Sequence, residues 1–191
     1  MCCICDAARF SVDAMNYAEL KINDIANGYG VRVSLFVSGC THRCPGCFNE
    51  IAWDFDYGTP FDEAVQERIL RALAPGYVNG LTLLGGEPFE PVNQRALVDF
   101  VREVKNRFPE KNVWCYTGYV LEKDLLAEGG RARCEATDAL LEGIDVLVDG
   151  PFVQAQYDIS LLFRGSANQR LIDMNATRKN GAVTLWQPPA V

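Results

Sequence analysis

Alternating apolar and polar segments along the chain predict strands separated by helices. Two helical segments carry apolar stripes, one ending at residues 75–76 and the other at Pro109, where proline and glycine interrupt the pattern. Strands that alternate with helices are typical of parallel βαβ units with right-handed crossovers. The predicted strands are apolar-rich runs over residues 31–37, 81–84, 113–116 and 144–148.

Capping and breaking residues mark the element boundaries. Thr59 is the predicted N-cap of the first helix, with Pro60 at its first helical position and an acidic residue in its first turn. Residues 121–141 should form helical stretches interrupted by a glycine pair, and residues 183–186 predict a short last strand. Because no linker, repeat or low-complexity segment interrupts the pattern, we expect one α/β domain over residues 15–191.

Residues 1–14 show no clear periodicity and precede a second methionine, Met15, so we expect a disordered extension outside the domain or an upstream start site. Cys2, Cys3 and Cys5 lie in this segment and have no fourth metal ligand nearby in the sequence. We therefore assign these three cysteines no role.

Composition and charge exclude several classes of function. The chain is 49% hydrophobic and 23% charged, which is ordinary for a globular protein. No apolar stretch approaches the roughly 18 residues of a membrane helix, and no signal peptide is evident, so we expect a cytoplasmic protein without a membrane partner. A net charge of −7 argues against nucleic-acid binding. In the cytoplasm thiols stay reduced, so the eight cysteines are expected to be metal ligands or small core residues.

A cluster of three cysteines directly follows the first predicted strand. Cys40, Cys44 and Cys47 have the spacing Cys-x3-Cys-x2-Cys. Three thiolates hold three corners of a four-iron cube and leave one iron open to a chelating ligand. The alternative is a tetrahedral zinc site completed by His42 or another cysteine, but no second cysteine knuckle follows. The spacing favours an iron–sulfur cluster.

Polar or glycine-rich segments follow every predicted strand. They are the cysteine loop and residues 85–88, 117–119 and 149–150. The carboxyl ends of parallel barrel strands share one face, so we expect these segments to surround one pocket. Residues 85–88, Gly-Gly-Glu-Pro, alone are typical of a tight turn. Beside an open iron, the glycines would let a ligand approach the backbone, and Glu87 or a nearby carbonyl could accept hydrogen bonds from its ammonium group.

The cysteine motif and the Gly-Gly-Glu-Pro segment together resemble the radical S-adenosylmethionine enzymes. Within that superfamily the chain is similar to the activating proteins of anaerobic ribonucleoside-triphosphate reductase, which are glycyl-radical enzyme activases. Gly46 stands where the wider superfamily commonly has an aromatic residue, and these activating proteins share that feature. The similar segments are residues 24–32, 35–39, 44–49, 114–119, 147–153 and 164–169, within a resemblance that covers about residues 15–170.

The resemblance implies a radical S-adenosylmethionine fold, an incomplete TIM-type barrel of parallel strands with outer helices. A complete barrel needs about 200–250 residues, so the shorter chain should leave an opening. It also implies a [4Fe-4S] cluster with one open iron, to which S-adenosylmethionine binds. The implied metal ligands and catalytic residues are Cys40, Cys44 and Cys47. The implied cofactor-binding residues are Gly46, Cys47, Phe48, Gly85, Gly86 and Glu87, with Thr117, Tyr119 and Asp149 as weaker candidates.

The implied reaction begins with one electron from a flavodoxin-type donor. Cleavage of the carbon–sulfur bond would give a 5′-deoxyadenosyl radical, which would take a hydrogen atom from a glycine of the large reductase subunit. The cysteine-rich insert of several related activases is absent between Cys47 and Gly85. Two alternatives remain: a small radical enzyme that rearranges a pterin-derived metabolite, and a zinc-stabilised binding module. Cys115 is expected in the core and Cys134 at the surface.

Overall fold

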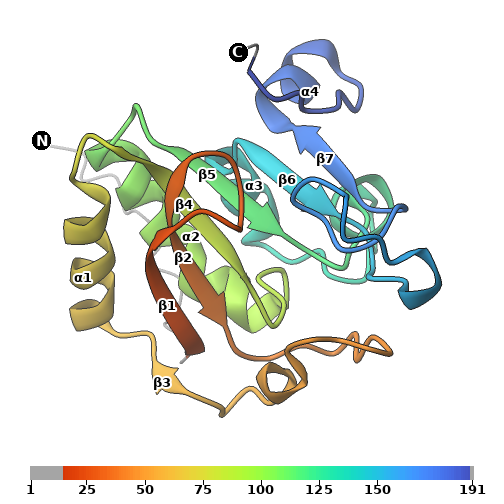
Figure 1. The fold of residues 1–191 in the computed structure, drawn as a ribbon, viewed down its shortest axis with the longest axis horizontal. Helices are drawn as coiled ribbons and strands as arrows, with labels where there is room; N and C mark the ends of the chain where they lie inside the picture. Colours follow the sequence, from red (N-terminus) through yellow and green to blue (C-terminus); the bar gives the residue numbers. More distant parts are fainter. Residues whose placement is uncertain (1–14, 190–191) are drawn as a thin grey trace, which may run out of the picture.

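A seven-stranded mixed sheet forms the centre of the computed structural model, which describes residues 15–189 (Figure 1). The strand order is β3-β1-β2-β4-β5-β6-β7, so β3 and β7 are open edges and the sheet does not close. Cys2, Cys3 and Cys5 lie outside the described residues. The strands are β1 (Asn16–Asp24), β2 (Val31–Val37), β3 (Thr59–Pro60), β4 (Val78–Gly85), β5 (Asn112–Tyr116), β6 (Val146–Asp149) and β7 (Arg170–Asp173).

Over residues 15–189 the strands are accompanied by four helices and three short helical turns. The apolar stripes predicted for the first two helices are buried, including Val65 and Ile69 in one and Leu97 and Val101 in the other. Among residues 15–189, no helix combines the length and apolar character needed to cross a bilayer. The helices are α1 (Glu63–Leu73), α2 (Pro91–Arg107), α3 (Thr137–Gly143) and α4 (Met174–Asn180), and the turns are η1 (Glu50–Trp53), the π-helical η2 (Leu121–Leu126) and η3 (Gln154–Gln156).

The four central strands, β2, β4, β5 and β6, run parallel, as the alternation of strands and helices predicted. Residues of neighbouring strands align in rows across the sheet, and one row faces the helices. Its members are fully buried in the main core, which confirms Cys115 as a core residue. The row is Leu35, Leu83, Cys115, Leu147 and Ile172.

Loops, rather than helices, cover part of the opposite face of the sheet. The next row on this face is Ser34, Thr82, Trp114 and Val146. Trp114 packs in a second apolar cluster with Trp186 and Phe163, which come from segments after β6. The helices therefore bury one face, while the other is left to loops that can surround a cavity.

Arg32 closes the amino-terminal end of this second face. Its guanidinium is fully buried, with Nε donating to Thr82 Oγ1 at 2.6 Å and Nη2 donating to the Leu81 carbonyl at 2.6 Å. It also lies 5.3 Å from the Trp114 ring centre. Burial lowers the pKa of Arg32 to about 10, yet the group stays charged at neutral pH. This arginine ties β2, β4 and β5 together beneath the loops.

The structure corrects several predicted boundaries. Thr59 and Pro60 do not begin a helix but form β3, which pairs with the start of β1. Asp62 is the N-cap, because its carboxylate accepts a hydrogen bond from Val65 N at 3.0 Å. Long-range strand pairing thus overrides a local helix signal. β1, β3 and β7 were missed as well, and all three pair antiparallel to their neighbours.

The predicted last strand over residues 183–186 is wrong. Only an isolated bridge joins Leu185 to Ile172, and β7 is instead the strand beside β6. The segment instead contributes an aromatic packing contact. The centre of the Trp186 ring lies 5.0 Å from that of Trp114 and 6.3 Å from that of Phe163. Trp186 therefore covers the second apolar cluster.

We expect Trp186→Ala to lower the free energy of unfolding by about 2 kcal/mol, because a half-buried aromatic ring contributes less than the roughly 3–5 kcal/mol of a core ring. Urea titration followed by circular dichroism measures the change. Tyr77→Ala is the control, since this side chain is 61% exposed and its loss should stay within about 0.5 kcal/mol. A loss for Trp186→Ala as small as that of the control would show that the Trp186 ring does not stabilise the fold.

Candidate functional site

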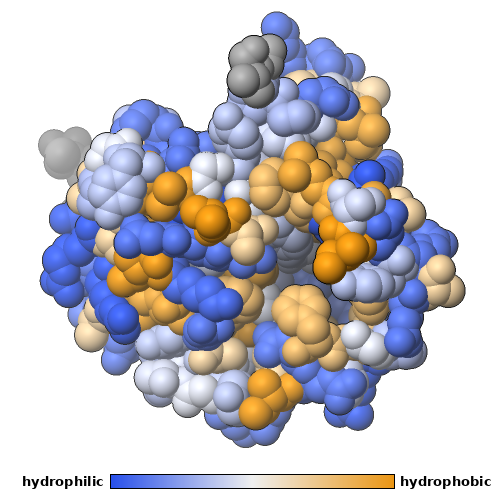
Figure 2. Space-filling view, in the orientation of Figure 1, coloured by the Kyte–Doolittle hydropathy of each residue, from blue (hydrophilic) through white to orange (hydrophobic). Residues whose placement is uncertain are grey.

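A cavity of about 830 Å³ lies where the parallel strands end. Its lining includes Cys40 after β2, Gly86 after β4, Thr117 after β5 and Gly150 after β6. The four segments therefore meet at one cavity, as the sequence predicted. In the orientation of Figure 1, Figure 2 shows a hollow near the middle of the molecule with apolar side chains at its rim.

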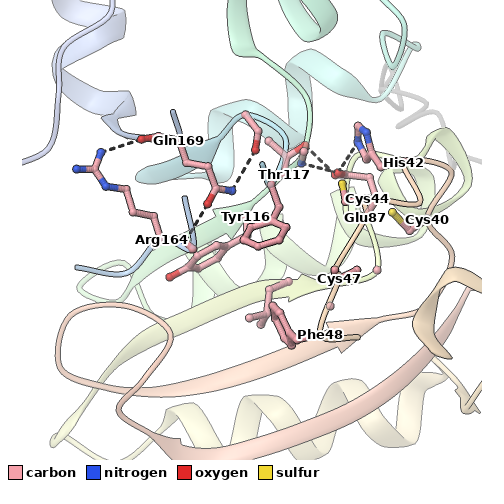
Figure 3. A pocket seen from close by; sticks show the side chains of 18 of the residues that line it. Cys40, His42, Cys44, Cys47, Phe48, Glu87, Tyr116, Thr117, Arg164 and Gln169 are labelled. Carbon is pink, nitrogen blue, oxygen red and sulfur yellow. Dashed lines mark hydrogen bonds and ion pairs between the residues drawn. The ribbon is translucent and has the colours of Figure 1, made fainter. Parts of the chain in front are cut away.

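The three cysteines of the motif all line this cavity and are half-buried free thiols (Figure 3). Their loop turns through a positive φ of 74° at Gly46, where glycine meets no Cβ penalty. Cys47 N then donates to the Cys44 carbonyl at 3.1 Å. Within residues 15–189, no three His, Cys, Asp or Glu side chains converge closely enough to enclose a single ion. The thiols thus share one cavity without meeting at one point.

Burial favours the protonated form of Cys40 and Cys44. It raises the pKa of Cys40 to about 12, and the negative charge of Glu87 acts in the same direction. Burial also raises the pKa of Cys44. Thiols in such surroundings stay protonated until a metal displaces the proton. Three thiols beside an open cavity are a donor set that fits an iron–sulfur cluster with one iron free of protein sulfur.

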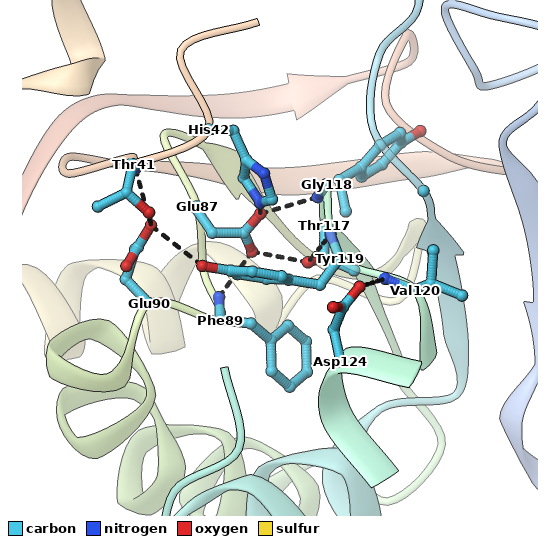
Figure 4. A network of polar contacts seen from close by, with 12 residues as sticks. Thr41, His42, Glu87, Phe89, Glu90, Thr117, Gly118, Tyr119, Val120 and Asp124 are labelled. Carbon is cyan, nitrogen blue, oxygen red and sulfur yellow. Dashed lines mark hydrogen bonds and ion pairs between the residues drawn. The ribbon is translucent and has the colours of Figure 1, made fainter. Parts of the chain in front are cut away.

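Glu87 is buried at the inner end of the cavity, with 1% of its surface exposed. One carboxylate oxygen accepts from Phe89 N and from Thr117 Oγ1, both at 2.8 Å. The other accepts from Gly118 N at 2.8 Å and lies 3.1 Å from Nε2 of His42 (Figure 4). A carboxylate offers about four acceptor positions, so protein donors occupy the whole side chain.

The glycines before Glu87 are required by close backbone packing. Gly85 has a φ of +108°, and a Cβ there would lie 2.7 Å from Phe36 Cα. A Cβ on Gly86 would lie 2.6 Å from the Gly39 carbonyl oxygen, at the start of the cysteine loop. Both glycines line the cavity, so they also leave its wall free of side chains.

Thr117 lines the cavity, whereas Tyr119 packs behind it. Besides donating to Glu87, the Thr117 hydroxyl accepts from Tyr119 N at 3.1 Å. Tyr119 is 3% exposed, and burial raises its pKa to about 12. Its hydroxyl donates to Glu90 at 3.4 Å.

Asp149 is absent from the cavity lining, although its neighbour Gly150 belongs to it. The carboxylate is buried and accepts from Leu121 N at 2.9 Å. It also forms a two-armed ion pair with Arg170, whose Nε donates at 2.9 Å. Asp149 and Glu122 raise the pKa of Arg170. These contacts join β6 and β7 to the η2 turn, and a ligand contact by the carboxylate would have to break them.

The outer wall of the cavity has no counterpart among the residues predicted for the site from the sequence. This wall is formed largely by residues 152–169, among them Phe152, Tyr157 and Phe163. Arg164 also lines it, and its Nη1 donates to the Gln169 carbonyl at 2.8 Å (Figure 3). Residues 164–169 carry no periodic pattern, and only their resemblance to a known family sets them apart in the sequence. Phe48, 90% exposed, lines the cavity as well.

Cys134 is half-buried rather than fully exposed, and it packs against the core instead of the cavity. Its sulfur accepts a hydrogen bond from the Thr137 hydroxyl at 3.7 Å. Cys134 is thus separate from the three thiols of the motif. It provides a matched cysteine for control substitutions.

Comparison with known proteins agrees with this geometry. Residues 26–172 match the family described as a 4Fe-4S single cluster domain. Over 157 residues, 81% of this chain, it is 45% identical to the anaerobic ribonucleoside-triphosphate reductase-activating protein of Haemophilus influenzae, and the match covers 96% of that protein. The proteins of the same name from Pasteurella multocida and Escherichia coli K12 are 46% and 40% identical over 157 residues, 95% and 96% of their lengths. The chain belongs to the family of anaerobic ribonucleoside-triphosphate reductase-activating proteins.

Proposed function

We propose that this chain is a radical S-adenosylmethionine activase that generates a glycyl radical on the large subunit of anaerobic ribonucleoside-triphosphate reductase. One observation carries the proposal: three free thiols and a glycine-walled strand end line the same cavity. The relatives named as activating proteins supply the identity of the target. Cys40, Cys44 and Cys47 would hold a [4Fe-4S] cluster.

The remaining cavity residues position S-adenosylmethionine. Gly85 and Gly86 expose backbone beside the cluster position, and Gly46 to Phe48 form the wall at the cysteine loop. Thr117 and Glu87 hold the inner end of the cavity rigid through their mutual hydrogen bond. When bound, the cluster and S-adenosylmethionine would supply reductive carbon–sulfur cleavage and the 5′-deoxyadenosyl radical. The chain itself orients the reactants and excludes competing reactions.

The open sheet supports a macromolecular target. Four parallel strands with helices on one face and a cavity at their carboxyl ends are compatible with a partial TIM-type barrel, the radical S-adenosylmethionine fold. Both sheet edges are open, so the barrel would remain incomplete and leave an entrance. Tyr157, at 59% exposed, and Phe48 line the cavity while facing solvent. A glycine-bearing segment of the reductase could enter there.

Electrons for this reaction would come from a flavodoxin-type donor. We place the activity in the cytoplasm, because the half-buried free thiols need a reducing compartment to stay available as metal ligands.

Anaerobic incubation with the reductase tests the proposal. The reconstituted chain, S-adenosylmethionine, a reductant and the large reductase subunit should together produce a glycyl-radical signal in electron paramagnetic resonance spectra. Omitting S-adenosylmethionine should remove the signal. A colourless protein that holds zinc instead of iron would contradict the proposal, and so would cofactor cleavage without any radical on the reductase. The latter result would favour a metabolite-modifying enzyme.

A further inference from the structure

The two residues that follow Cys40 in the cysteine loop are both bound by buried carboxylates from the neighbouring strand end. The backbone N and the hydroxyl of Thr41 donate to Glu90 Oε1 at 2.8 and 2.6 Å. Nε2 of His42 lies 3.1 Å from Glu87 Oε2. Glu87 and Glu90 are 1% and 5% exposed, so the carboxylate side of these contacts is shielded from water (Figure 4).

Further contacts enclose the imidazole of His42. Its ring centre lies 4.3 Å from that of Tyr119. On another side it covers Gly118, where an added Cβ would lie 2.8 Å from the imidazole. The His42 side chain is 9% exposed and also lines the cavity. Residues from the ends of β4 and β5 therefore determine where this part of the cysteine loop lies.

The direction of the His42 hydrogen bond follows from its partner. A carboxylate only accepts, so Nε2 carries the proton and donates to Glu87. With Phe89 N, Thr117 Oγ1 and Gly118 N, this donor completes the four positions of the carboxylate. A ligand ammonium group could bind the Glu87 side chain only by displacing one of these donors. The Glu87 carboxylate therefore anchors the protein loops that donate to it.

We infer that His42 is a positioning residue, which through Glu87 sets the placement of Cys40 and Cys44 for the cluster. The inference rests on the proposed function and deepens it. The Thr41–Glu90 pair acts in the same way from the adjacent position. Together they tie the cysteine loop to the strand end that carries the glycine wall, so that the cluster and its ligand are placed by one connected network.

The test compares His42→Leu with His42→Gln in the reconstituted, full-length protein. Leucine removes the donor, whereas glutamine can again donate to Glu87. We expect His42→Leu to bind iron but to give an altered electron paramagnetic resonance spectrum of the reduced cluster. The S-adenosylmethionine concentration that perturbs this spectrum should rise roughly 10- to 100-fold, as is usual for loss of an outer-sphere partner. His42→Gln should restore most of the wild-type spectrum.

Lys105→Met is the matched control, because Lys105 forms a comparable pair with Asp145 at 2.8 Å outside the cavity. It should leave the spectrum and its response to S-adenosylmethionine unchanged. The inference would be overturned if folded His42→Leu kept the wild-type spectrum and the wild-type response to S-adenosylmethionine. It would also be overturned if His42→Gln changed the spectrum as much as His42→Leu does. Wild-type protein that fails to hold iron or cleave S-adenosylmethionine would instead reject the proposed function, so the two failures are distinguishable.

Discussion

Cys44→Ala is expected to abolish both the iron–sulfur chromophore and the cleavage of S-adenosylmethionine. Cys44 is one of three thiols among residues 15–189 that line the cavity, and two remaining thiolates cannot retain a cluster that already lacks a fourth protein ligand. Iron content, visible absorbance and formation of 5′-deoxyadenosine with dithionite as reductant measure the loss under anaerobic conditions.

Cys134→Ala is the matched control for this substitution. Its thiol is also half-buried but packs against the core, away from the cavity. The variant should keep the iron content and the cleavage activity of the wild type. Retained cleavage in Cys44→Ala would refute its assignment as a cluster ligand, whereas loss in both variants would indicate a general effect of cysteine removal.

Gly85→Ala is expected to lower the free energy of unfolding by about 3–5 kcal/mol. A φ of +108° is strained for alanine, and the added Cβ would lie 2.7–2.8 Å from backbone atoms of Phe36 and Val37. Backbone atoms of a central strand cannot move aside as a flexible side chain can, so steric overlap adds to the conformational cost. Urea titration followed by circular dichroism measures the difference from wild type.

Gly129→Ala separates the conformational cost of a positive φ from the cost of steric overlap. Gly129 also has a positive φ, of +73°, but an added Cβ there has no neighbour within 4 Å. Only the conformational cost remains, about 1–2 kcal/mol. Equal losses in the two variants would show that close packing at the end of β4 contributes nothing, and an unaffected Gly85→Ala protein would reject the described geometry.

Much of the fold could be predicted because its central strands and first helices carry strong local patterns. β2, β4 and β5 are buried strands with apolar-rich sequences, and α1 and α2 have continuous apolar stripes. The missed strands lack such signals. β1 carries Glu19 and Lys21 and is largely half-exposed, while β7 is only four residues long with a charged residue at each end. Their formation depends on pairing with distant strands, not on local preference.

The candidate site, like the fold, was predictable from the sequence only in part. The spacing of Cys40, Cys44 and Cys47 identified the thiols, and the glycines at residues 85–86 pointed to the strand end beside them. The outer wall from residues 152–169 was missed as part of the site, since an irregular loop gives no periodic signal. Asp149 was expected near the cofactor, yet its carboxylate is paired with Arg170 outside the cavity lining.

The sequence alone determined which chemical groups the site contains, because residue types and short spacings are covalent properties of the chain. Only the tertiary structure decided how those groups are used. Glu87 illustrates the difference: its donors include Thr117 and His42, which lie 30 and 45 positions away in the sequence. Whether a carboxylate is free for a ligand depends on how many donors surround it in space, and folding alone brings those donors together.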